Sequence, residues 1–461
     1  MIADLKPYPA YKESGLPWLG DVPEHWDVKR LKLLLREVDC RSSTGKEQLL
    51  RVSQYTGVTQ RKLMDGTDSP DSRAASLVGY KRVMPNDLVI NIMLAWNGSM
   101  GVSRYEGIAS PAYCVYRFNS GALPLYYHEL LRIPLYKSRI KTASTGVIES
   151  RLRLYSDDLG RIEAILPPPD EQAAIVRFLG WSNGQLEKAI RAKRKVITLL
   201  NEQKQVIIHR AVTRGLDPSV PLKPSGIPWL GDIPEHWEVR PIKTLLRETD
   251  SRSTDGADTL LSLTRNRGLI PHSEMTNKMH SAKTLVGYKQ YKPGQIVMNR
   301  MQAWSGMFGS GAVFGLVSPD YAVFDILGKH EVKFVLARLK AKDLVGQFAI
   351  ASKGIGSGFN RLYTDRFGPI RITIPPIDEQ YSIVAYIDRE TNGLNTAISR
   401  FEREIELLRE YRTRLVADVV TGELDVREAA AKLPDEALID LTENDRVEAL
   451  EDEPFEEEAV L

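Results

Sequence analysis

The chain has 461 residues, of which 43% are hydrophobic and 26% charged, so it is long enough for two or three folded domains. No apolar run approaches the roughly 18 to 20 residues needed to cross a bilayer, and the N-terminus lacks a signal-peptide layout; we expect a cytoplasmic protein. The two cysteines, Cys40 and Cys114, have no partners at metal-ligand spacing, which argues against a disulfide framework or a metal site.

The charge is unevenly distributed along the chain. The net charge is +2, but residues 426–461 carry 13 acidic and 3 basic side chains, which leaves +12 on the rest. This pattern predicts a basic folded body and an acidic, flexible tail over residues 425–461. A basic body suggests a polyanionic partner such as nucleic acid.

An internal repeat organises the rest of the sequence. SGLPWLGDVPEHW at 14–26 returns as SGIPWLGDIPEHW at 225–237, and the segment at 77–96 returns at 285–304. LPPPDEQAAIV, which begins at Leu166, returns as IPPIDEQYSIV from Ile374. Such fixed-offset similarity predicts two similar structural units.

Each repeat predicts a globular domain followed by a long helix. Short apolar runs such as DLVINIML, bounded by Pro, Gly and Asn, are typical of strands, so we expect a mixed α/β (α+β) fold. The predicted segments, in chain order, are a first domain over 1–165, a first helix over 166–215, a second domain over 216–373, a second helix over 374–424 and the tail over 425–461.

Apolar residues in both helical segments alternate in steps of four and three, which predicts a coiled-coil seam. The predicted seam residues are Leu186, Ile190, Ile197, Leu200 and Ile207 in the first helix, and Leu394, Ile398, Phe401, Ile405, Leu408 and Leu415 in the second. Basic residues also fall on the seam, at Lys193, Lys204 and Arg412. Because Lys204 and Arg412 occupy equivalent positions and would repel each other in a parallel pair, we expect antiparallel helices. The alternative is two amphipathic helices, each packed only on its own domain.

Motifs for catalysis are scarce. The sequence has no phosphate-binding Gly-rich loop, and its Pro-Pro strings lack the polar and aromatic residues of an adenine methyltransferase motif. Asp320, Glu331 and Lys333 match a loose pattern for a Mg²⁺-dependent nuclease, but Ala112 occupies the place of Asp320 in the first repeat. Three classes therefore remain: a DNA-recognition protein, this nuclease, and a coiled-coil scaffold that binds only proteins.

Taken together, the duplicated PWLGD-PEHW opening, the repeated apolar segment ending in Ala-Trp, and the PP-x-DEQ sequence before each helix resemble the specificity subunit of type I restriction-modification systems. The resemblance covers residues 12–425. It implies two target recognition domains that each read one half of a split sequence in double-stranded DNA, and antiparallel spacer helices that dock methyltransferase subunits.

The resemblance also implies that this chain has no enzymatic activity or cofactor of its own. Two modification subunits, which are adenine-N6 methyltransferases, would use S-adenosylmethionine. Two restriction subunits, which are motor nucleases, would use ATP and Mg²⁺.

Comparison of the two repeats suggests which residues read DNA. Positions identical in both cannot distinguish two different half-sites, whereas positions that differ on a shared frame can. The clearest difference sets Gln54, Tyr55 and Thr56 against Arg265, Asn266 and Arg267, and we predict base readout by these residues. A second pair of loops supplies candidates for contact with phosphate: Arg151, Arg153, Lys353 and Arg361.

The near-identical opening motif has the opposite implication. Because PWLGD-PEHW is the same in both repeats, it is a poor candidate for reading sequence, and we interpret it as a joint between helix and domain. His25 and His236 lie in this motif without a second metal-ligating residue nearby, so we expect them to be packed or capping side chains.

Overall fold

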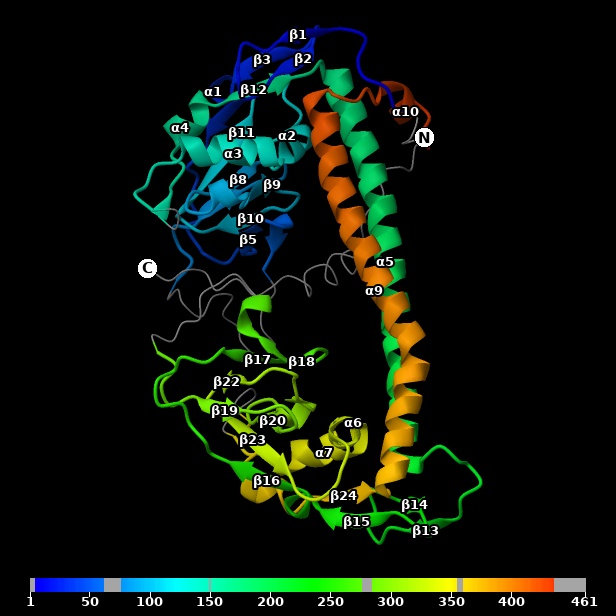
Figure 1. The fold of residues 1–461 in the computed structure, drawn as a ribbon. Coiled ribbons are helices and arrows are strands. Elements are labelled where there is room, and N and C mark those ends of the chain that lie inside the picture. Colours follow the sequence, from blue (N-terminus) through cyan, green and yellow to red (C-terminus); the bar gives the residue numbers. More distant parts are fainter. Residues whose placement is uncertain (1–4, 62–75, 149–150, 276–283, 355–359, 435–461) are drawn as a thin grey trace. The chain divides into compact units, whose positions relative to one another are not determined.

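The computed structural model describes residues 5–61, 76–148, 151–275, 284–354 and 360–434 (Figure 1). The chain divides into two compact units, residues 1–193 with 403–461 and residues 194–402. The divisions fall inside the two long helices, α5 (Pro169–Arg214) and α9 (Ile377–Thr421). Each unit therefore contains one globular part, the start of the helix that follows it, and the end of the other helix.

The first unit is built around a four-stranded antiparallel sheet with the order β4-β11-β8-β9. Its strands are β1 (Tyr11–Glu13), β2 (Asp21–Pro23), β3 (Asp27–Arg30), β4 (Leu35–Glu37), β5 (Leu50–Ser53), β6 (Gly57–Gln60), β7 (Lys81–Val83), β8 (Leu88–Asn91), β9 (Met100–Val102), β10 (Gly107–Ala109), β11 (Tyr113–Phe118) and β12 (Glu163–Leu166). Its shorter helices are α1 (Leu31–Leu34), the 3-10 helix η2 (Ala95–Asn97), α2 (Pro124–Leu130), α3 (Pro134–Ala143), α4 (Ser156–Arg161) and α10 (Arg427–Ala431).

The second unit repeats this topology, with the sheet order β16-β23-β20-β21. Its strands are β13 (Leu222–Pro224), β14 (Asp232–Pro234), β15 (Glu238–Pro241), β16 (Leu246–Thr249), β17 (Leu261–Thr264), β18 (Gly268–Pro271), β19 (Lys289–Tyr291), β20 (Ile296–Asn299), β21 (Phe308–Gly309), β22 (Gly315–Val317), β23 (Tyr321–Ile326) and β24 (Arg371–Ile374). Its shorter helices are η4 (Ile242–Thr244), η5 (His272–Glu274), η6 (Ala303–Ser305), α6 (Val332–Leu339), α7 (Lys342–Ala351) and α8 (Thr364–Phe367). The sequence repeat is thus a repeat of fold, and the predicted α+β class is confirmed.

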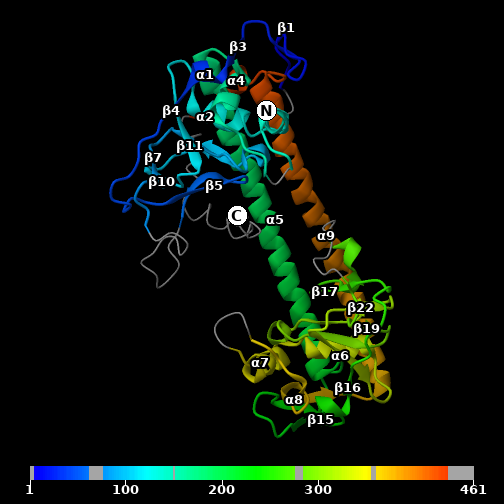
Figure 2. The same cartoon turned by 90° about the vertical axis from the view of Figure 1, so that its left-hand side faces the viewer.

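Within each unit, two features occupy opposite ends. The ribbons β3–β12 and β15–β24 lie at the end where the following long helix begins, and the hairpins β5–β6 and β17–β18 lie at the other end (Figure 1, Figure 2). Each hairpin covers a small core of its own, which is separate from the main core of its unit. The part of each unit that varies between the repeats therefore lies away from the joint with the helix.

The main core of each unit includes side chains from both long helices. In the first unit, Phe178 of α5 and Val419 of α9 are buried in the same cluster as Trp26. In the second unit, Val212 of α5 and Ile383 of α9 are buried in the corresponding cluster. Because apolar burial is the main favourable term in folding, each domain is stabilised by the end of the other domain's helix as well as by its own.

The two long helices pack together in antiparallel orientation, as predicted. In the first unit, Lys193 Nζ lies 2.5 Å from Glu404 Oε2, and Arg412 Nη1 lies 3.3 Å from Glu187 Oε2. Residue numbers thus rise along one helix as they fall along the other. Lys193 and Arg412 each face an acidic partner across the pair, so antiparallel packing removes the repulsion that a parallel pair would have.

The seam positions themselves are sheltered from solvent. Ile190 and Leu415 are only 1% and 3% exposed. The other members are buried or half-buried, namely Leu186, Ile197, Leu200, Ile207, Leu394, Ile398, Phe401, Ile405 and Leu408. In the second unit the basic seam residue Lys204 donates to Asn395 Oδ1 at 2.7 Å.

The segment after the second helix departs from the prediction at its start. Residues 425–434, predicted as the beginning of a flexible tail, pack on the first unit: Val426 and Ala430 belong to its core, Leu433 is also buried, and Arg177 donates to the carbonyl of Leu433 at 2.6 Å. A few small apolar residues in an acidic stretch give too weak a pattern to reveal this. Residues 435–461 lie outside the described residues. Every described helix is too short or too polar to span a bilayer.

Candidate nucleic-acid interface

The repeated Pro-Glu-His-Trp motif folds onto the start of the long helix. In the first unit, Trp26 Nε1 donates to Glu171 Oε2 at 2.9 Å, and His25 Nε2 lies 2.6 Å from Glu171 Oε1. Glu171 belongs to the PP-x-DEQ sequence and stands in the first turn of α5, where the unpaired backbone N–H groups favour a carboxylate. The two repeated motifs are therefore the two sides of one joint.

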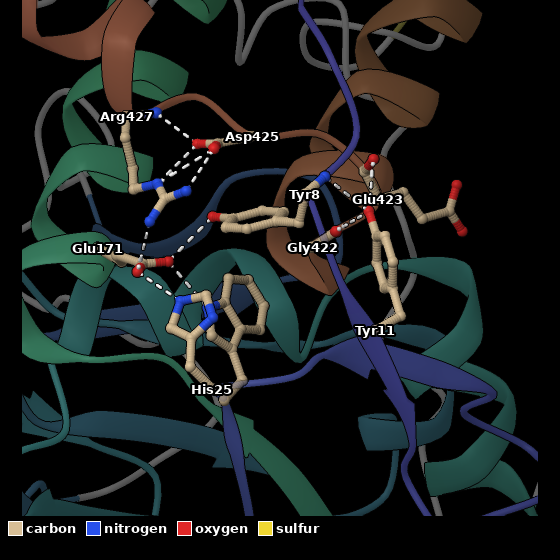
Figure 3. A network of polar contacts seen from close by, with 9 residues as sticks. Tyr8, Tyr11, His25, Glu171, Gly422, Glu423, Asp425 and Arg427 are labelled. Atoms are coloured by element: carbon tan, nitrogen blue, oxygen red, sulfur yellow. Dashed lines mark hydrogen bonds and ion pairs between the residues drawn. The ribbon is translucent and has the colours of Figure 1, made fainter.

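Two further residues complete this joint in the first unit (Figure 3). Tyr8 donates its hydroxyl hydrogen to Glu171 Oε2 at 3.1 Å, and Arg427 Nη1 lies 3.3 Å from Glu171 Oε1. Arg427 also pairs with Asp425 and lies over the Tyr8 ring, 4.9 Å from its centroid. Burial, reinforced by the Glu171 charge, raises the pKa of Tyr8, so this hydroxyl remains a donor.

The first joint brings together the N-terminal and C-terminal segments of the chain. The backbone N–H of Asp425 donates to the Lys6 carbonyl at 2.8 Å. Figure 3 shows a second contact, in which the Tyr11 hydroxyl donates to the Gly422 carbonyl at 3.0 Å. Gly422 has φ +83°, and a Cβ there would lie 2.5 Å from Pro23 Cγ, so only glycine fits. The first domain thus begins where the second helix ends.

The second joint uses a continuous piece of chain instead. Trp237 Nε1 donates to Glu379 Oε2 at 3.1 Å, and His236 Nε2 lies 2.6 Å from the same oxygen. Gly215, which ends α5, approaches both partners, since a Cβ there would lie 2.9 Å from Glu379 and 3.5 Å from Trp237. The contacts agree with the interpretation of PWLGD-PEHW as a joint in both units, whereas the two histidines, expected to be packed or capping, pair with the glutamates and keep 43% of their side chains exposed.

The glutamine that follows each glutamate ties the helix to the domain. Gln172 donates from Nε2 to the carbonyls of Gly121 and Pro167, at 2.9 and 2.8 Å, and accepts from the Leu123 N–H at 2.7 Å. Gln380 makes the equivalent bonds in the second unit with Pro375 and Glu331. The PP-x-DEQ sequence therefore has a structural role in joining the helix to the domain. The residues predicted to read bases lie in other parts of each unit.

In the first unit, the predicted base readers are the three loop residues of the β5–β6 hairpin. Ser53, the last residue of β5, pairs with Gly57, the first residue of β6, and Gly57 has φ +75°, which is typical of a three-residue hairpin loop. Tyr55 at the tip is 51% exposed. Gln54 is half-buried, and Thr56 Oγ1 is buried without a hydrogen-bond partner among the described residues. Tyr55 is thus the residue that this loop presents.

The second triplet occupies the same three-residue loop between β17 and β18, closed by Thr264 and Gly268. Arg265, Asn266 and Arg267 are all exposed. Arg267 Nη2 lies 2.5 Å from Glu274 Oε2, and Arg265 donates from Nη1 to the Ser305 carbonyl at 2.9 Å. The structure therefore brings each predicted triplet together on one loop, with Asn266 at the tip position equivalent to Tyr55.

Two residues beneath the first hairpin were not predicted. His128, near the end of α2, accepts the Val102 N–H at Nδ1 at 3.1 Å, and burial, followed by the charges of Arg132 and Arg104, lowers its pKa to about 3. Arg132 follows the same helix. The repeats contain a signal for both residues, because the positions 208 residues later hold Leu336 and Lys340.

The predicted phosphate contacts lie on a second pair of loops, after α3 and α7. Thr145 pairs with Arg153, and Lys353 pairs with Arg361, so each basic residue stands at the base of its loop. Arg151 and Lys353 are exposed, whereas Arg153 and Arg361 are half-buried. Arg361 Nη1 lies 3.6 Å from Asp320 Oδ1. Residues 149–150 and 355–359 of these loops lie outside the described residues.

The residues of the nuclease alternative do not converge. Asp320 faces Arg361, whereas Lys333 Nζ lies 2.9 Å from Asp388 Oδ2. Glu331 accepts from the backbone N–H of Lys333 as the N-cap of α6. Within the described ranges, His, Cys, Asp and Glu side chains form no group of three that could hold a metal ion. Nothing in the site favours this alternative.

A duplicated α+β unit with two long antiparallel helices is the architecture that the resemblance to type I specificity subunits implies. No family model matches the chain. An alignment of 460 residues, covering 90% of this chain and 98% of its relative, is 22% identical to the putative type I restriction enzyme MjaX specificity subunit of Methanocaldococcus jannaschii. A second alignment, over 250 residues and 51% of this chain, is 24% identical to the type I restriction enzyme MjaVIII specificity subunit of the same organism and spans about half of it, 53%.

The fold agrees with these relatives. A chain solved in work on complex assembly and conformational transition of the type I R-M system superposes with a TM-score of 0.59, over 87% of this chain and 99% of that chain, at 15% identity. At that identity the likeness concerns the fold alone. The resemblance indicated by the sequence motifs is therefore confirmed in sequence and in fold.

Proposed function

We propose that this chain is the DNA-recognition subunit of a type I restriction-modification complex, in which each globular unit reads one half of a split target in double-stranded DNA. The observation that carries the proposal is the pair of equivalent hairpins. Both have the same strand register and loop length, yet all three loop residues differ between them. A shared frame with different polar tips suits a protein that reads two different short sequences.

The long helices set the spacing between the half-sites and dock the methyltransferase subunits. Away from the seam, they expose apolar side chains that a partner subunit could cover. These residues are Val196, Leu199 and Val206 on α5, and Leu407 and Tyr411 on α9.

The chemistry belongs to the partners. The modification subunits bind S-adenosylmethionine and methylate adenine at N6, and the restriction subunits use ATP and Mg²⁺ for translocation and cleavage. This chain contributes recognition and geometry. The relatives support this division because they are specificity subunits by name.

Co-expression with the cognate modification subunit, followed by mapping of N6-methyladenine on genomic DNA, tests the function. We expect a split motif of two unlike half-sites separated by a fixed number of unread base pairs. A control complex with both loop triplets replaced by Gly-Ser-Gly should keep assembly and lose sequence preference. A continuous motif, or methylation with no preference in the unaltered complex, would refute the proposal.

The salt dependence of binding separates this function from that of a scaffold that binds only proteins. Phosphate contacts release counterions, so affinity for duplex DNA should fall steeply with salt, by roughly 10³-fold or more between 50 and 200 mM if six or more phosphates are neutralised. A protein-only scaffold would show no duplex binding beyond that of the modification subunits alone.

A further inference from the structure

The two recognition hairpins dock on their units in the same way. Gly57 of the first hairpin approaches Gly101 of β9 so closely that a Cβ on Gly101 would lie 3.0 Å from the Gly57 Cα. In the second unit a Cβ on Gly309 would lie 3.2 Å from the Gly268 Cα. This glycine contact fixes the base of each hairpin and leaves the loop above it to be held by other groups.

In the first unit, one arginine holds that loop from within the protein. Arg132 donates from Nη2 to the carbonyls of Gln54 and Tyr55, at 3.0 and 2.7 Å, and from Nη1 to the Ser53 carbonyl at 3.4 Å. Its Nη1 also bonds the Met100 carbonyl at 2.5 Å. A single planar guanidinium thus joins three consecutive residues of the hairpin to the strand beneath it, and planar arginine is suited to such multiple contacts.

In the second unit, the loop is held mainly by one of its own residues, Arg265. The residue equivalent to Arg132 is Lys340, whose Nζ contacts only one loop carbonyl, that of Arg265, at 3.5 Å. With this one long contact, Lys340 is a weaker anchor than Arg132, and burial, followed by the charges of Arg265 and Lys204, also lowers the pKa of the lysine. Arg265 itself provides the stronger hold: its Nη1 donates to the Ser305 carbonyl at 2.9 Å and its Nη2 to Ser305 Oγ at 3.0 Å.

We propose that Arg132 and Arg265 are positioning residues: each fixes the loop of its own recognition hairpin through hydrogen bonds to other protein groups and so governs discrimination in one half-site without contacting a base. Reading of bases then falls to the loop tips, Tyr55 and Asn266. The inference rests on the proposed function, and it revises the prediction that Arg265 reads bases. Recognition requires side chains held to about 0.5 Å, so loss of the anchor should weaken discrimination at every base that the hairpin reads.

The test uses the full complex with its modification subunits and DNA duplexes that carry the mapped target and every single-base change in each half-site. Arg132→Met roughly keeps the length of the side chain and removes its hydrogen-bond donors. We expect the preference for the mapped target over its single-base changes, measured as methylation kcat/KM, to fall about tenfold across the positions of one half-site. Preference in the other half-site should stay within about twofold, and Arg132→Lys should restore part of the loss. Arg265→Met should give the mirror result in the other half-site.

Amide hydrogen exchange of the DNA-free full chain gives a second readout that needs no activity. Arg132→Met should speed exchange at residues 54–57 and leave residues 265–268 unchanged, and Arg265→Met should do the reverse. Arg161→Met is the matched control, because this exposed arginine pairs with Asp158 far from either loop in sequence. Lys340→Met should have a smaller effect than Arg265→Met.

The outcomes separate the possible roles. Relaxation at a single base pair with unchanged loop exchange would show that the arginine contacts a base and would overturn the inference. Equal loss in both half-sites, together with lower thermal stability, would show a merely structural role and would also overturn it. Failure of the proposed function is visible separately, because the unaltered complex would then show no split preference, while the exchange experiment would still decide the positioning.

Discussion

At the scale of single residues, the joints show how one carboxylate organises a repeated motif. Glu171 accepts hydrogen bonds or ion pairs from Tyr8, His25, Trp26 and Arg427, and its side chain is 10% exposed. Among the described residues, Glu379 pairs with His236 and Trp237 alone, and its side chain is 25% exposed. The two glutamates occupy equivalent positions, but Glu171 pairs with more side chains than Glu379 does.

This difference predicts unequal effects of mutation. Glu171→Ala leaves the buried Trp26 indole N–H without its acceptor and removes one of the two carboxylates that pair with Arg427, and should destabilise the first unit by about 2–4 kcal/mol. Glu379→Ala should cost the second unit less, about 1–2 kcal/mol, because solvent can replace more of its contacts. Urea unfolding followed by proteolysis, with peptides assigned to each unit, measures both. Asp170→Ala, at the exposed neighbouring carboxylate, is the control, and equal losses in the two units would contradict the argument.

His128 predicts a pH dependence confined to the first unit. Its folded-state pKa of about 3 lies below the usual 6.5, so between these values the unfolded chain binds more protons and stability falls as the pH falls. The slope due to this group is at most about 1.4 kcal/mol per pH unit. In His128→Leu, which copies Leu336 of the second unit, unfolding of the first unit between pH 4 and 6 should depend less on pH. If the unfolding free energy of the first unit depended on pH as steeply in His128→Leu as in the unaltered protein, other groups would be responsible and the prediction would be wrong.

At the scale of elements, the long helices separate two sets of apolar residues. Seam residues such as Ile190 are buried against the other helix, whereas Leu199 is 55% exposed. The first set stabilises the helix pair and the second is available to a partner. The positions follow from the heptad spacing, because residues on one face recur in steps of three and four.

Two substitutions on α5 should therefore separate stability from assembly. Ile190→Ala removes a buried side chain and should cost about 2–4 kcal/mol of unfolding free energy. Leu199→Ala should change stability by less than about 0.5 kcal/mol but weaken binding of the modification subunit. Thermal unfolding and titration with the purified partner check the pair. If Leu199→Ala bound the modification subunit with unaltered affinity, Leu199 would not belong to the docking surface.

Much of the arrangement of helices and joints could be predicted from the sequence, because each repeat can be compared with the other. The seam, the antiparallel pair and the joint follow from periodicity, from the placement of Lys204 and Arg412, and from motifs that recur together. The anchoring of the hairpins could not be predicted, since Arg132 lies 79 residues from Ser53 and no periodicity links them. The packing of α10 was missed because burial of Ala430 and Leu433 depends on the tertiary surface of the first unit.

At the scale of the whole molecule, the two units are alike in topology but differ in how the chain supplies them. The second is one continuous segment, 194–402, whereas the first needs residues from both ends of the chain. Its core includes Leu415, Val419 and Val426, and the Tyr126 hydroxyl donates to the Val420 carbonyl at 2.8 Å. The first domain is therefore not complete without the C-terminal part of the second helix.

Removal of residues 1–26 tests this dependence. The truncation deletes Trp26, which is fully buried, and the strands that contact the end of α9, so it should destabilise the first unit by at least about 3–5 kcal/mol. What the second unit reads should not change. Limited proteolysis, and methylation of duplexes altered in one half-site at a time, follow the two effects. A change in the second half-site would contradict the independence of the units.

The meeting of Lys6 and Asp425 has a consequence for the order of synthesis on the ribosome. Domains commonly fold one by one as they emerge, the N-terminal one first. Here the residues made first cannot complete their core until the last part of α9 is translated, whereas the domain made second has all its residues earlier. The domain that is synthesised first is thus the last to finish folding. Until Gly422 and its neighbours have been made, the apolar side chains of Val22 and Trp26 are not covered by them.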